Sequence, residues 1–298
     1  MADISNIQLP RDGGLDALPP ESPFCLPGTQ SHLMRAQASG DLYRLDIALP
    51  EGTAPEGGWP LILLLDAAGC FGTCVEALRR MSRRPDATGV VPAVVIGVAM
   101  PDRSYDVSRR QRDFTSGQST GERPGARQDT ENANGGAAAF LQFIEAQVKP
   151  LAAKQACINP SRQTLFGHSL AGYFTLWVLG NHPHTFRNYA AISPSIWWDR
   201  PGLTAAISAA PLRDRRTLIC LGEWEDVLPP WQRVAPGSAE VVARRQARDM
   251  LGHAQTLTSQ LKAIHGEERA RFHFLPEEDH ASIVSAAIPR MLRMASLD

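Results

Sequence analysis

The sequence predicts an α/β fold with a mostly parallel central sheet and helices on both faces. Short apolar blocks of strand length recur along the chain, and segments with helical periodicity separate most of them. In one place a strand-like run passes through a serine directly into an apolar helix-like run, Thr164–Phe174. Parallel strands need a crossover connection, which is usually a helix, so this alternation favours a mostly parallel sheet.

Length and composition indicate an ordinary globular protein. The 298 residues include 43% hydrophobic and 20% charged residues, enough for one large core. Residues 1–30, rich in Pro, Gly and Asp, are expected to form an extended arm before a single domain at 31–298. The formal charge of −1 gives no general attraction to nucleic acids or anionic membranes, so neither is expected as a partner.

Apolar runs and cysteines place further limits on the protein. The longest apolar runs are far shorter than the ~20 residues of a membrane-spanning helix. The N-terminus as written lacks the basic and apolar regions of a signal peptide, which predicts a cytoplasmic protein, or a periplasmic one if a signal peptide has been removed. Five cysteines argue against a disulfide scaffold. Cys70 and Cys74 lack partners at metal-ligand spacing, so no metal site is expected.

The expected elements follow from local periodicity. Strands are expected at 42–49, 61–66, 90–100, 162–168, 189–195, 217–222 and 271–276. Helices are expected at 137–148, 170–180, 202–210, 240–264 and 283–294. Leu42–Leu49 alternates in polarity, which indicates a strand near a sheet edge. The 137–148 helix is expected to end before Pro150, and 101–134 shows no periodicity and is expected to be an irregular functional loop.

The stretch TLFGHSLAGYF approximates the Gly-x-Ser-x-Gly signature of a nucleophile elbow around Ser169. A serine at a sharp strand-to-helix turn projects its hydroxyl above the sheet, as the α/β-hydrolase fold requires. Ala171 replaces the final glycine, but a residue at the start of a helix needs no special backbone conformation. The alternative interpretation is an ordinary turn in which Ser169 caps the helix.

A serine nucleophile needs a base and an orienting acid, which follow it in the order Ser, acid, His in α/β-hydrolases. His280 lies in a polar loop after the last expected strand and is the predicted base. The strand at 217–222 runs into an acidic segment, in which the spacing favours Glu225 as the acid. Glu223 and Asp226 are close alternatives, and Asp199 is a more distant one.

Backbone donors for the developing oxyanion are expected on two loops. One is the N–H of Leu170, directly after the serine, and the other comes from Ala67 or Ala68 after the strand at 61–66. Tryptophans also gather after expected strands and suit a substrate with flat aromatic groups, although packing under loops would explain each one equally well. The candidate substrate-binding tryptophans are Trp197, Trp198 and Trp224.

Beyond single motifs, the chain resembles the esterase D-type α/β-hydrolases, and among them the ferric-siderophore (enterobactin-type trilactone) esterases. The resemblance covers roughly residues 40–295. The matching stretches are SGDLYRLDIALPEG, LILLLD, the R-x-x-D-x-T of Arg110–Thr115, GGAAAFLQFIEAQVKP, INPSRQTLFGHSLAGYFTLWVL, ISPSIWWD, LGEWED and EEDHAS.

The resemblance implies that Ser169 is the nucleophile and His280 the base, acting on ester bonds of tricatecholate siderophores to release iron. A Ser–His dyad without an engaged acid remains an alternative. Arg110 would contact the anionic ferric complex. The chain departs from the family at Ala171 and at Ala67-Ala68, where Asp-Gly and a small polar residue are expected. That departure bears on the geometry of the oxyanion loop and therefore on substrate choice.

The leading hypothesis is therefore a serine esterase whose partner is a small-molecule ester, a ferric siderophore. Acylation and deacylation of Ser169 need no cofactor and no metal, and iron enters only as part of the substrate. One alternative is a general carboxylesterase or thioesterase for small acyl or aromatic esters. Another is a non-catalytic module that keeps the fold and binds an aromatic anion.

Overall fold

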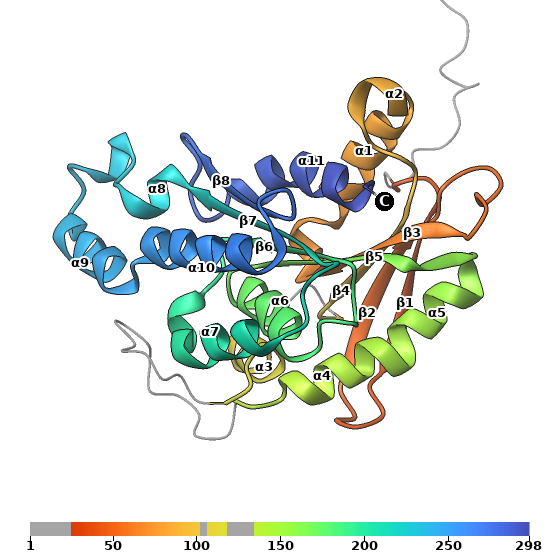
Figure 1. Ribbon diagram of the computed structural model, residues 1–298, viewed down its shortest axis with the longest axis horizontal. Coiled ribbons are helices and arrows are strands. Elements are labelled where there is room, and N and C mark those ends of the chain that lie inside the picture. Colours follow the sequence, from red (N-terminus) through yellow and green to blue (C-terminus); the bar gives the residue numbers. More distant parts are fainter. Residues whose placement is uncertain (1–24, 102–105, 118–133, 298) are drawn as a thin grey trace, which may run out of the picture.

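A computed structural model of the chain describes residues 25–101, 106–117 and 134–297. Within them, eight strands form one sheet in the order β1-β2-β4-β3-β5-β6-β7-β8 (Figure 1). β2 pairs antiparallel with β1 and β4, and all other neighbours are parallel. The strands are β1 (Thr29–Arg35), β2 (Leu42–Ala48), β3 (Trp59–Leu65), β4 (Val94–Ala99), β5 (Ile158–His168), β6 (Asn188–Ile192), β7 (Arg216–Gly222) and β8 (Ala270–Leu275).

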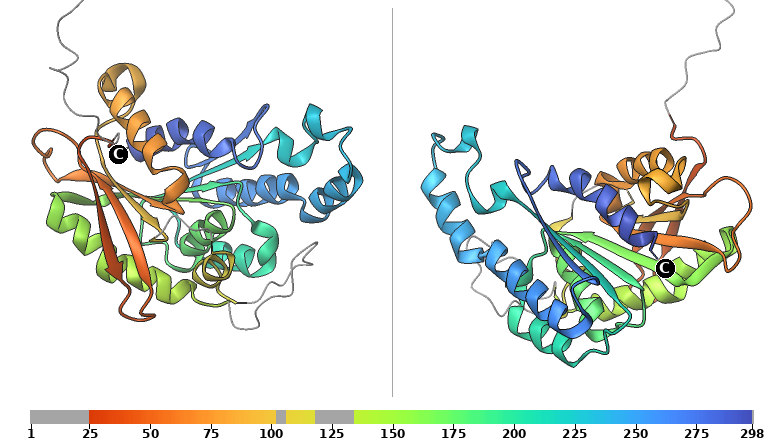
Figure 2. Two further views of the ribbon diagram at one scale, coloured as in Figure 1. Left: turned by 180° about the vertical axis from the view of Figure 1, so that it is seen from behind. Right: turned by 45° about the horizontal axis from the view of Figure 1, so that its top comes forward.

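Helices cover both faces of this sheet (Figures 1 and 2). Two of them, α1 (Phe71–Ser82) and α11 (Ile283–Ala295), pack on one face. The other face carries α4 (Ala137–Phe143), α5 (Lys149–Gln155), α6 (Leu170–Asn181), α7 (Arg200–Ala209) and α10 (Met250–His265). Strand residues alternate between the two cores, as in β3, where Leu63 faces the α6 side and Ile62 and Leu64 the α1 side. The predicted fold class is confirmed.

The structure also contains further helices and helical turns. They are α2 (Pro85–Thr88), α3 (Val107–Phe114), α8 (Glu223–Asp226), α9 (Ser238–Arg248), the 3₁₀ turns η2 (Ala67–Gly69), η4 (Ile196–Trp198) and η5 (Pro230–Gln232), and the π-helical turn η3 (Ile144–Val148). In the described part of the chain, no helix has the length and apolar character needed to span a bilayer.

The N-terminal region differs from expectation at its boundary. Residues 1–24 of the expected arm lie outside the described residues. β1 begins at Thr29, so the end of the expected arm overlaps the first residues of this strand. β1 occupies the sheet edge and makes β2 the second strand, which agrees with the prediction that Leu42–Leu49 lies near an edge.

Part of the stretch expected to be irregular, 101–134, is helical. α3 has the sequence VSRRQRDF, in which polar residues conceal the helical period. Its N-terminus is stabilised by Asp106, whose carboxylate accepts a hydrogen bond from the N–H of Arg109 at 3.0 Å. The prediction for residues 102–105 and 118–133 falls outside the described residues.

No helix is expected from the sequence at the position of α1, Phe71–Ser82.

Two helix boundaries were also wrong. The helix expected to end before Pro150 continues through η3 into α5, and Pro150 lies in the first turn of α5, directly after the π-helical turn. The helix expected at 240–264 is interrupted at Asp249, whose φ of 38° is left-handed. The Asp249 carboxylate accepts a hydrogen bond from Gly252 N–H at 3.2 Å and so caps α10 as a separate helix.

A close approach between β4 and the turn after β3 fixes where that turn lies. Ala67 is fully buried, and its methyl packs against Gly97 in the middle of β4. A Cβ added at Gly97 would lie 2.5 Å from the Cβ of Ala67 and 3.1 Å from the Phe71 ring. Glycine at 97 therefore leaves the space in which the η2 turn sits.

We predict that Gly97→Ala lowers the free energy of unfolding by about 1–3 kcal/mol, because the added methyl must displace the η2 turn. Urea unfolding of the full chain measures it. Gly72→Ala is the matched control: its Cβ meets nothing within 4 Å. As a helix residue it should leave stability unchanged or raise it by up to about 1 kcal/mol. Equal effects of the two substitutions would show that the packing of Ala67 on Gly97 is not a constraint.

Candidate active site

Ser169 occupies a strained turn between β5 and α6. Its backbone has φ 59° and ψ −117°, a conformation that L-residues rarely adopt. Two hydrogen bonds hold the turn: Ser169 N–H donates to Ile192 O at 2.9 Å, and Ser195 N–H donates to Ser169 O at 3.0 Å. A Cβ at Gly167 would overlap the backbone carbonyl of Ala171, so glycine is needed at 167. The local geometry is that of a nucleophile elbow.

The departure at Ala171 is accommodated in the core. The Ala171 side chain is fully buried among the hydrophobic residues on the α6 side of the sheet. The close approach of the helix to the next strand falls instead at Gly172, where a Cβ would lie 3.0 Å from Ile192 O and 3.1 Å from Pro194 Cα. The small residue that this crossing needs is present one position later than in the Gly-x-Ser-x-Gly pattern.

Ser169, His280 and Glu225 form a hydrogen-bonded chain. The Nε2 atom of His280 lies 3.0 Å from Ser169 Oγ, and its Nδ1 atom lies 2.5 Å from Glu225 Oε2. The His280 side chain is half exposed, whereas that of Glu225 is buried. The three side chains come from segments after β5, β8 and β7, which end at the same edge of the sheet.

Glu225 is held as a carboxylate by its neighbours. Besides His280, its Oε1 atom accepts hydrogen bonds from the Ser193 hydroxyl and from Gly222 N–H, the latter at 3.0 Å. Burial alone would raise the pKa of Glu225, but these hydrogen bonds and the charge of His280 outweigh it and hold the pKa below its usual value of 4.5. Sequence reasoning missed Ser193, although its position directly after β6 was a usable signal.

The other acids considered have different partners. Glu223 Oε2 accepts a hydrogen bond from Glu277 N–H at 2.9 Å. Asp199 Oδ1 accepts from Gly202 N–H at 3.1 Å and caps α7. Asp226 is exposed. In the described structure, it is Glu225 that contacts the imidazole of His280.

The loop that carries His280 is braced on both sides. Asp279 Oδ1 accepts hydrogen bonds from the N–H groups of Ala281 and Ser282, each at 2.8 Å. Glu278 O accepts a hydrogen bond from Trp224 N–H at 3.0 Å. The same carbonyl lies so close to Gly222 that a Cβ at position 222 would overlap it. Contacts with the acid-bearing turn therefore fix the position of the imidazole.

A second histidine, His168, lies under the imidazole of His280. The two ring centroids are 4.5 Å apart at an interplanar angle of 48°. Burial, together with the charge of His280, lowers the pKa of His168 to about 3, so this ring is neutral at physiological pH. Sequence reasoning did not assign His168 a role, because a histidine beside the serine reads only as part of the motif.

The backbone around Ser169 offers candidate oxyanion donors. Leu170 is the first residue of α6, so its N–H has no acceptor within the helix. Across the sheet, Asp66 adopts a left-handed conformation with φ 51° and turns the chain into Ala67 and Ala68. Ala67 is buried and Ala68 exposed.

Arg110 braces this second turn. It lies on α3 rather than in an irregular loop, and only 6% of its surface is exposed. Its Nε and one terminal nitrogen donate to Asp66 Oδ2 at 2.8 and 2.6 Å. Its charge makes a small contribution to the low pKa of His168, after burial and the charge of His280. Contact of Arg110 with substrate stays a prediction, and burial favours action through Asp66.

The predicted tryptophans differ in accessibility. Trp198 is only 5% exposed and packs in the core. Trp197 is partly buried, with the Arg248 guanidinium 4.8 Å from its ring centroid. Trp224 is partly buried next to Glu225 and meets Trp231 edge-on, with centroids 4.6 Å apart. Trp231 is 59% exposed, so the Trp224–Trp231 pair offers more accessible aromatic surface than Trp198.

The lowered pKa of Glu225 predicts how stability depends on pH. Glu225→Gln should cost about 1–3 kcal/mol near pH 7, where the carboxylate makes its hydrogen bonds. A carboxyl with a depressed folded-state pKa contributes stability above its unfolded pKa and loses it as the pH falls through the folded value. The gap between wild type and variant should therefore shrink below about pH 4.5.

Urea unfolding at several pH values between 7 and 3 measures this gap. Glu240→Gln, at an exposed position on α9, is the matched control and should change stability little. A gap that stays constant from neutral to acidic pH would contradict the assignment of Glu225 as a stabilised carboxylate.

Comparison with known proteins identifies the family to which the chain belongs. The model of the family described as "Putative esterase" matches residues 36–277. A ferri-bacillibactin esterase, BesA of Bacillus subtilis, is 35% identical over 276 residues, covering 91% of each chain. A siderophore enterobactin esterase of Emericella nidulans is 32% identical over 290 residues, covering 88% of this chain and 93% of that protein.

Solved structures of related proteins have the same fold as this chain. The BES protein of Bacillus cereus superposes with a TM-score of 0.78 at 27% identity, covering 94% of this chain and all of that one. The siderophore hydrolase EstA of Aspergillus nidulans gives a TM-score of 0.77 at 26% identity, over 94% and 98% of the two chains. The chain therefore belongs to this esterase family and is an ester hydrolase with the α/β-hydrolase fold.

Proposed function

We propose that the protein is a serine esterase in which Ser169 is the nucleophile, His280 the general base and Glu225 the acid that orients it. The observation that supports this best is the hydrogen-bonded chain from Ser169 Oγ through His280 to buried Glu225, built at a strained elbow. Such a chain lets the imidazole take up the hydroxyl proton while the carboxylate stabilises the resulting cation.

The reaction would proceed in two halves. Ser169 Oγ attacks the ester carbonyl carbon as its proton passes to His280 Nε2, and a tetrahedral oxyanion forms. Collapse breaks the bond to the alcohol oxygen, which takes the proton from His280 and leaves an acyl-Ser169 ester. Water then attacks the acyl carbon with His280 again as base, and the carboxylic acid and free Ser169 are released.

The oxyanion would be bound by backbone N–H groups on the two facing turns. Leu170 supplies one donor and Ala67 or Ala68 the other. Arg110 would act by holding Asp66, and through it the backbone of this second turn, in place. His168, neutral beneath His280, would support the imidazole without adding a competing positive charge.

The proposed substrate is a ferric tricatecholate trilactone siderophore such as enterobactin, with hydrolysis leading to iron release. Relatives at 35% and 32% identity are named as esterases of ferri-bacillibactin and enterobactin. The paired rings of Trp224 and Trp231 beside Glu225 supply aromatic surface suited to flat catechol groups. Iron would be part of the substrate, and the reaction itself uses only side chains and backbone of this chain.

We predict that Ser169→Ala lowers kcat for ester hydrolysis by about 10⁴-fold or more and abolishes labelling by a fluorophosphonate probe. Steady-state kinetics and gel fluorescence measure the two effects. Ser161→Ala, at an exposed serine near the other end of β5, is the matched control and should behave as wild type. Labelling of Ser169→Ala at the wild-type level would refute Ser169 as the nucleophile, whereas failure of the probe to label the wild type would favour a binding module.

Substrate preference separates the siderophore proposal from a general esterase or thioesterase. We expect kcat/KM for a ferric tricatecholate trilactone to exceed that for short p-nitrophenyl esters and acyl thioesters. Trp224→Leu should lower only the trilactone value, by about tenfold, because stacked aromatic contacts are each worth ~1 kcal/mol or more. Equal or better turnover of the simple esters would reject the siderophore assignment while leaving the esterase assignment intact.

A further inference from the structure

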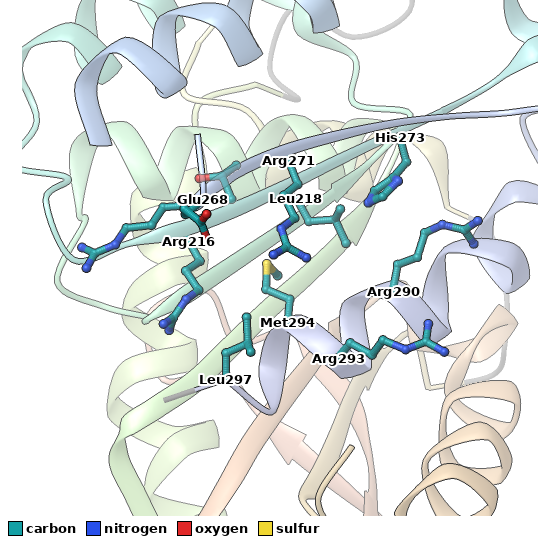
Figure 3. Close-up of a pocket in the computed structure, with 11 residues that line it drawn as sticks. Arg216, Leu218, Glu268, Arg271, His273, Arg290, Arg293, Met294 and Leu297 are labelled. Carbon is teal, nitrogen blue, oxygen red and sulfur yellow. The ribbon is translucent and has the colours of Figure 1, made fainter. Parts of the chain in front are cut away.

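A cationic cavity lies beside α11, on the last two strands of the sheet. It has a volume of about 280 Å³ and is lined by Arg216, Arg269, Arg271, Arg290 and Arg293 together with His273. Glu268 is the one acid among the described residues that line it. In Figure 3, the β8 side chains of Arg271 and His273 face the helix that carries Arg290 and Met294.

Strand register explains why the basic residues gather here. β7 and β8 are parallel, with Leu218 opposite Arg271 and Cys220 opposite His273. Leu218 and Cys220 face the α11 side of the sheet, so their partners on β8 face it too. Arg271 and His273 of β8 therefore add basic side chains to one surface, which α11 faces with further arginines. Arg269, directly before β8, lines the same cavity.

The charges in this cavity are only partly compensated within the described structure. Arg269 pairs with Asp214 at 3.1 Å. Arg290 donates to the carbonyl of Ala286 at 2.8 Å, and Arg293 to that of Thr88 at 3.2 Å, so both bind neutral groups and have further donors. Among the described residues, no carboxylate lies within ion-pair distance of Arg271, Arg290 or Arg293.

The lowered pKa of His273 is consistent with a concentration of positive charge in the cavity. Its pKa is lowered first by burial and then by the charges of Arg290 and Arg271. The two guanidinium groups therefore act on the same imidazole, one from α11 and one from β8. Like charges held together in a cavity favour an anion between them, because guanidinium groups bind oxyanions through paired, charge-assisted hydrogen bonds.

Size and position separate this cavity from the esterase site. Its volume lies just below the range of ~300–1,000 Å³ typical of drug-sized ligands, so it suits a small ligand and not a tricatecholate complex. Arg216 begins β7, whereas Glu225 follows the other end of that strand. The proposed ligand Arg271 is in register with Leu218. At ~3.3 Å per residue, the stretch from Leu218 to Gly222 places it roughly 13 Å from the strand end that Glu225 follows.

We propose that the cavity between β7, β8 and α11 is a binding site for a small multivalent oxyanion, with Arg271 and Arg290 as its principal ligands. A phosphate-type anion and a polycarboxylate share the required chemistry. Both present several oxygens to a guanidinium fork, and both carry enough negative charge to balance more than one arginine. The site is independent of ester hydrolysis and of the residues proposed to perform it.

Isothermal titration calorimetry on the full chain tests this with pyrophosphate, inorganic phosphate and citrate in separate arms. Sodium chloride at matched ionic strength corrects for general screening. We expect saturable binding of at least one multivalent anion with a stoichiometry near one. The anion that binds most tightly shows whether the site prefers a phosphate-type anion or a polycarboxylate. Arg271→Gln/Arg290→Gln should weaken that binding at least about tenfold.

The matched control is Arg200→Gln/Arg244→Gln, which removes the same charge at exposed arginines of α7 and α9. It should bind the anion as wild type does. Circular dichroism and p-nitrophenyl ester hydrolysis verify that both double variants are folded, since neither pair belongs to the proposed esterase site. Absence of saturable binding in all three arms, or equal weakening in both double variants, would overturn the proposal.

Discussion

The strained backbone at Ser169 is the constraint around which the rest of the site is built. A non-glycine residue in such a conformation costs on the order of 1–3 kcal/mol, so its surroundings must impose it. One constraint comes from β6, where Ile192 O accepts a hydrogen bond from Ser169 N–H. Close contacts at Gly167 and Gly172 supply the rest, because side chains at either position would push strand and helix apart. The methyl of Ala171 points into the core and leaves this geometry intact.

Parallel pairing gathers the remaining groups around that turn. β5 to β8 run in the same direction, so the segments that follow them emerge at one edge of the sheet. Ser193 follows β6, Glu225 follows β7 and His280 follows β8. The three meet through hydrogen bonds although 87 residues separate the first from the last. Each loop then needs only to orient its functional side chain toward Ser169. For His280, the packing of the Glu278 carbonyl on Gly222 holds the loop in place.

Sequence predicted the parts of this arrangement that depend on local pattern. Strand blocks, the turn at Ser169 and a late histidine in a loop are all visible in short windows. The sequence alone does not distinguish Glu225 from Glu223, because both follow the same strand. The geometry of the turn directs Glu225 to His280 and Glu223 to the N–H of Glu277. α3 was missed because its buried face is formed by Arg110, Asp113 and Phe114, and ion pairs there replace the apolar stripe that reveals a helix.

A net charge of −1 conceals two opposed local environments at the two ends of β7. At the carboxyl end, a buried carboxylate is balanced by an imidazole and by hydroxyl and backbone donors. Around the amino end, arginines outnumber acids. Arg271 lies level with Leu218, so roughly 13 Å of strand separates it from the carboxyl end of β7, which exceeds the Debye length of ~8 Å at physiological ionic strength. Through solvent, an anion bound near Arg271 would therefore interact only weakly with the charged groups at the carboxyl end of the strand.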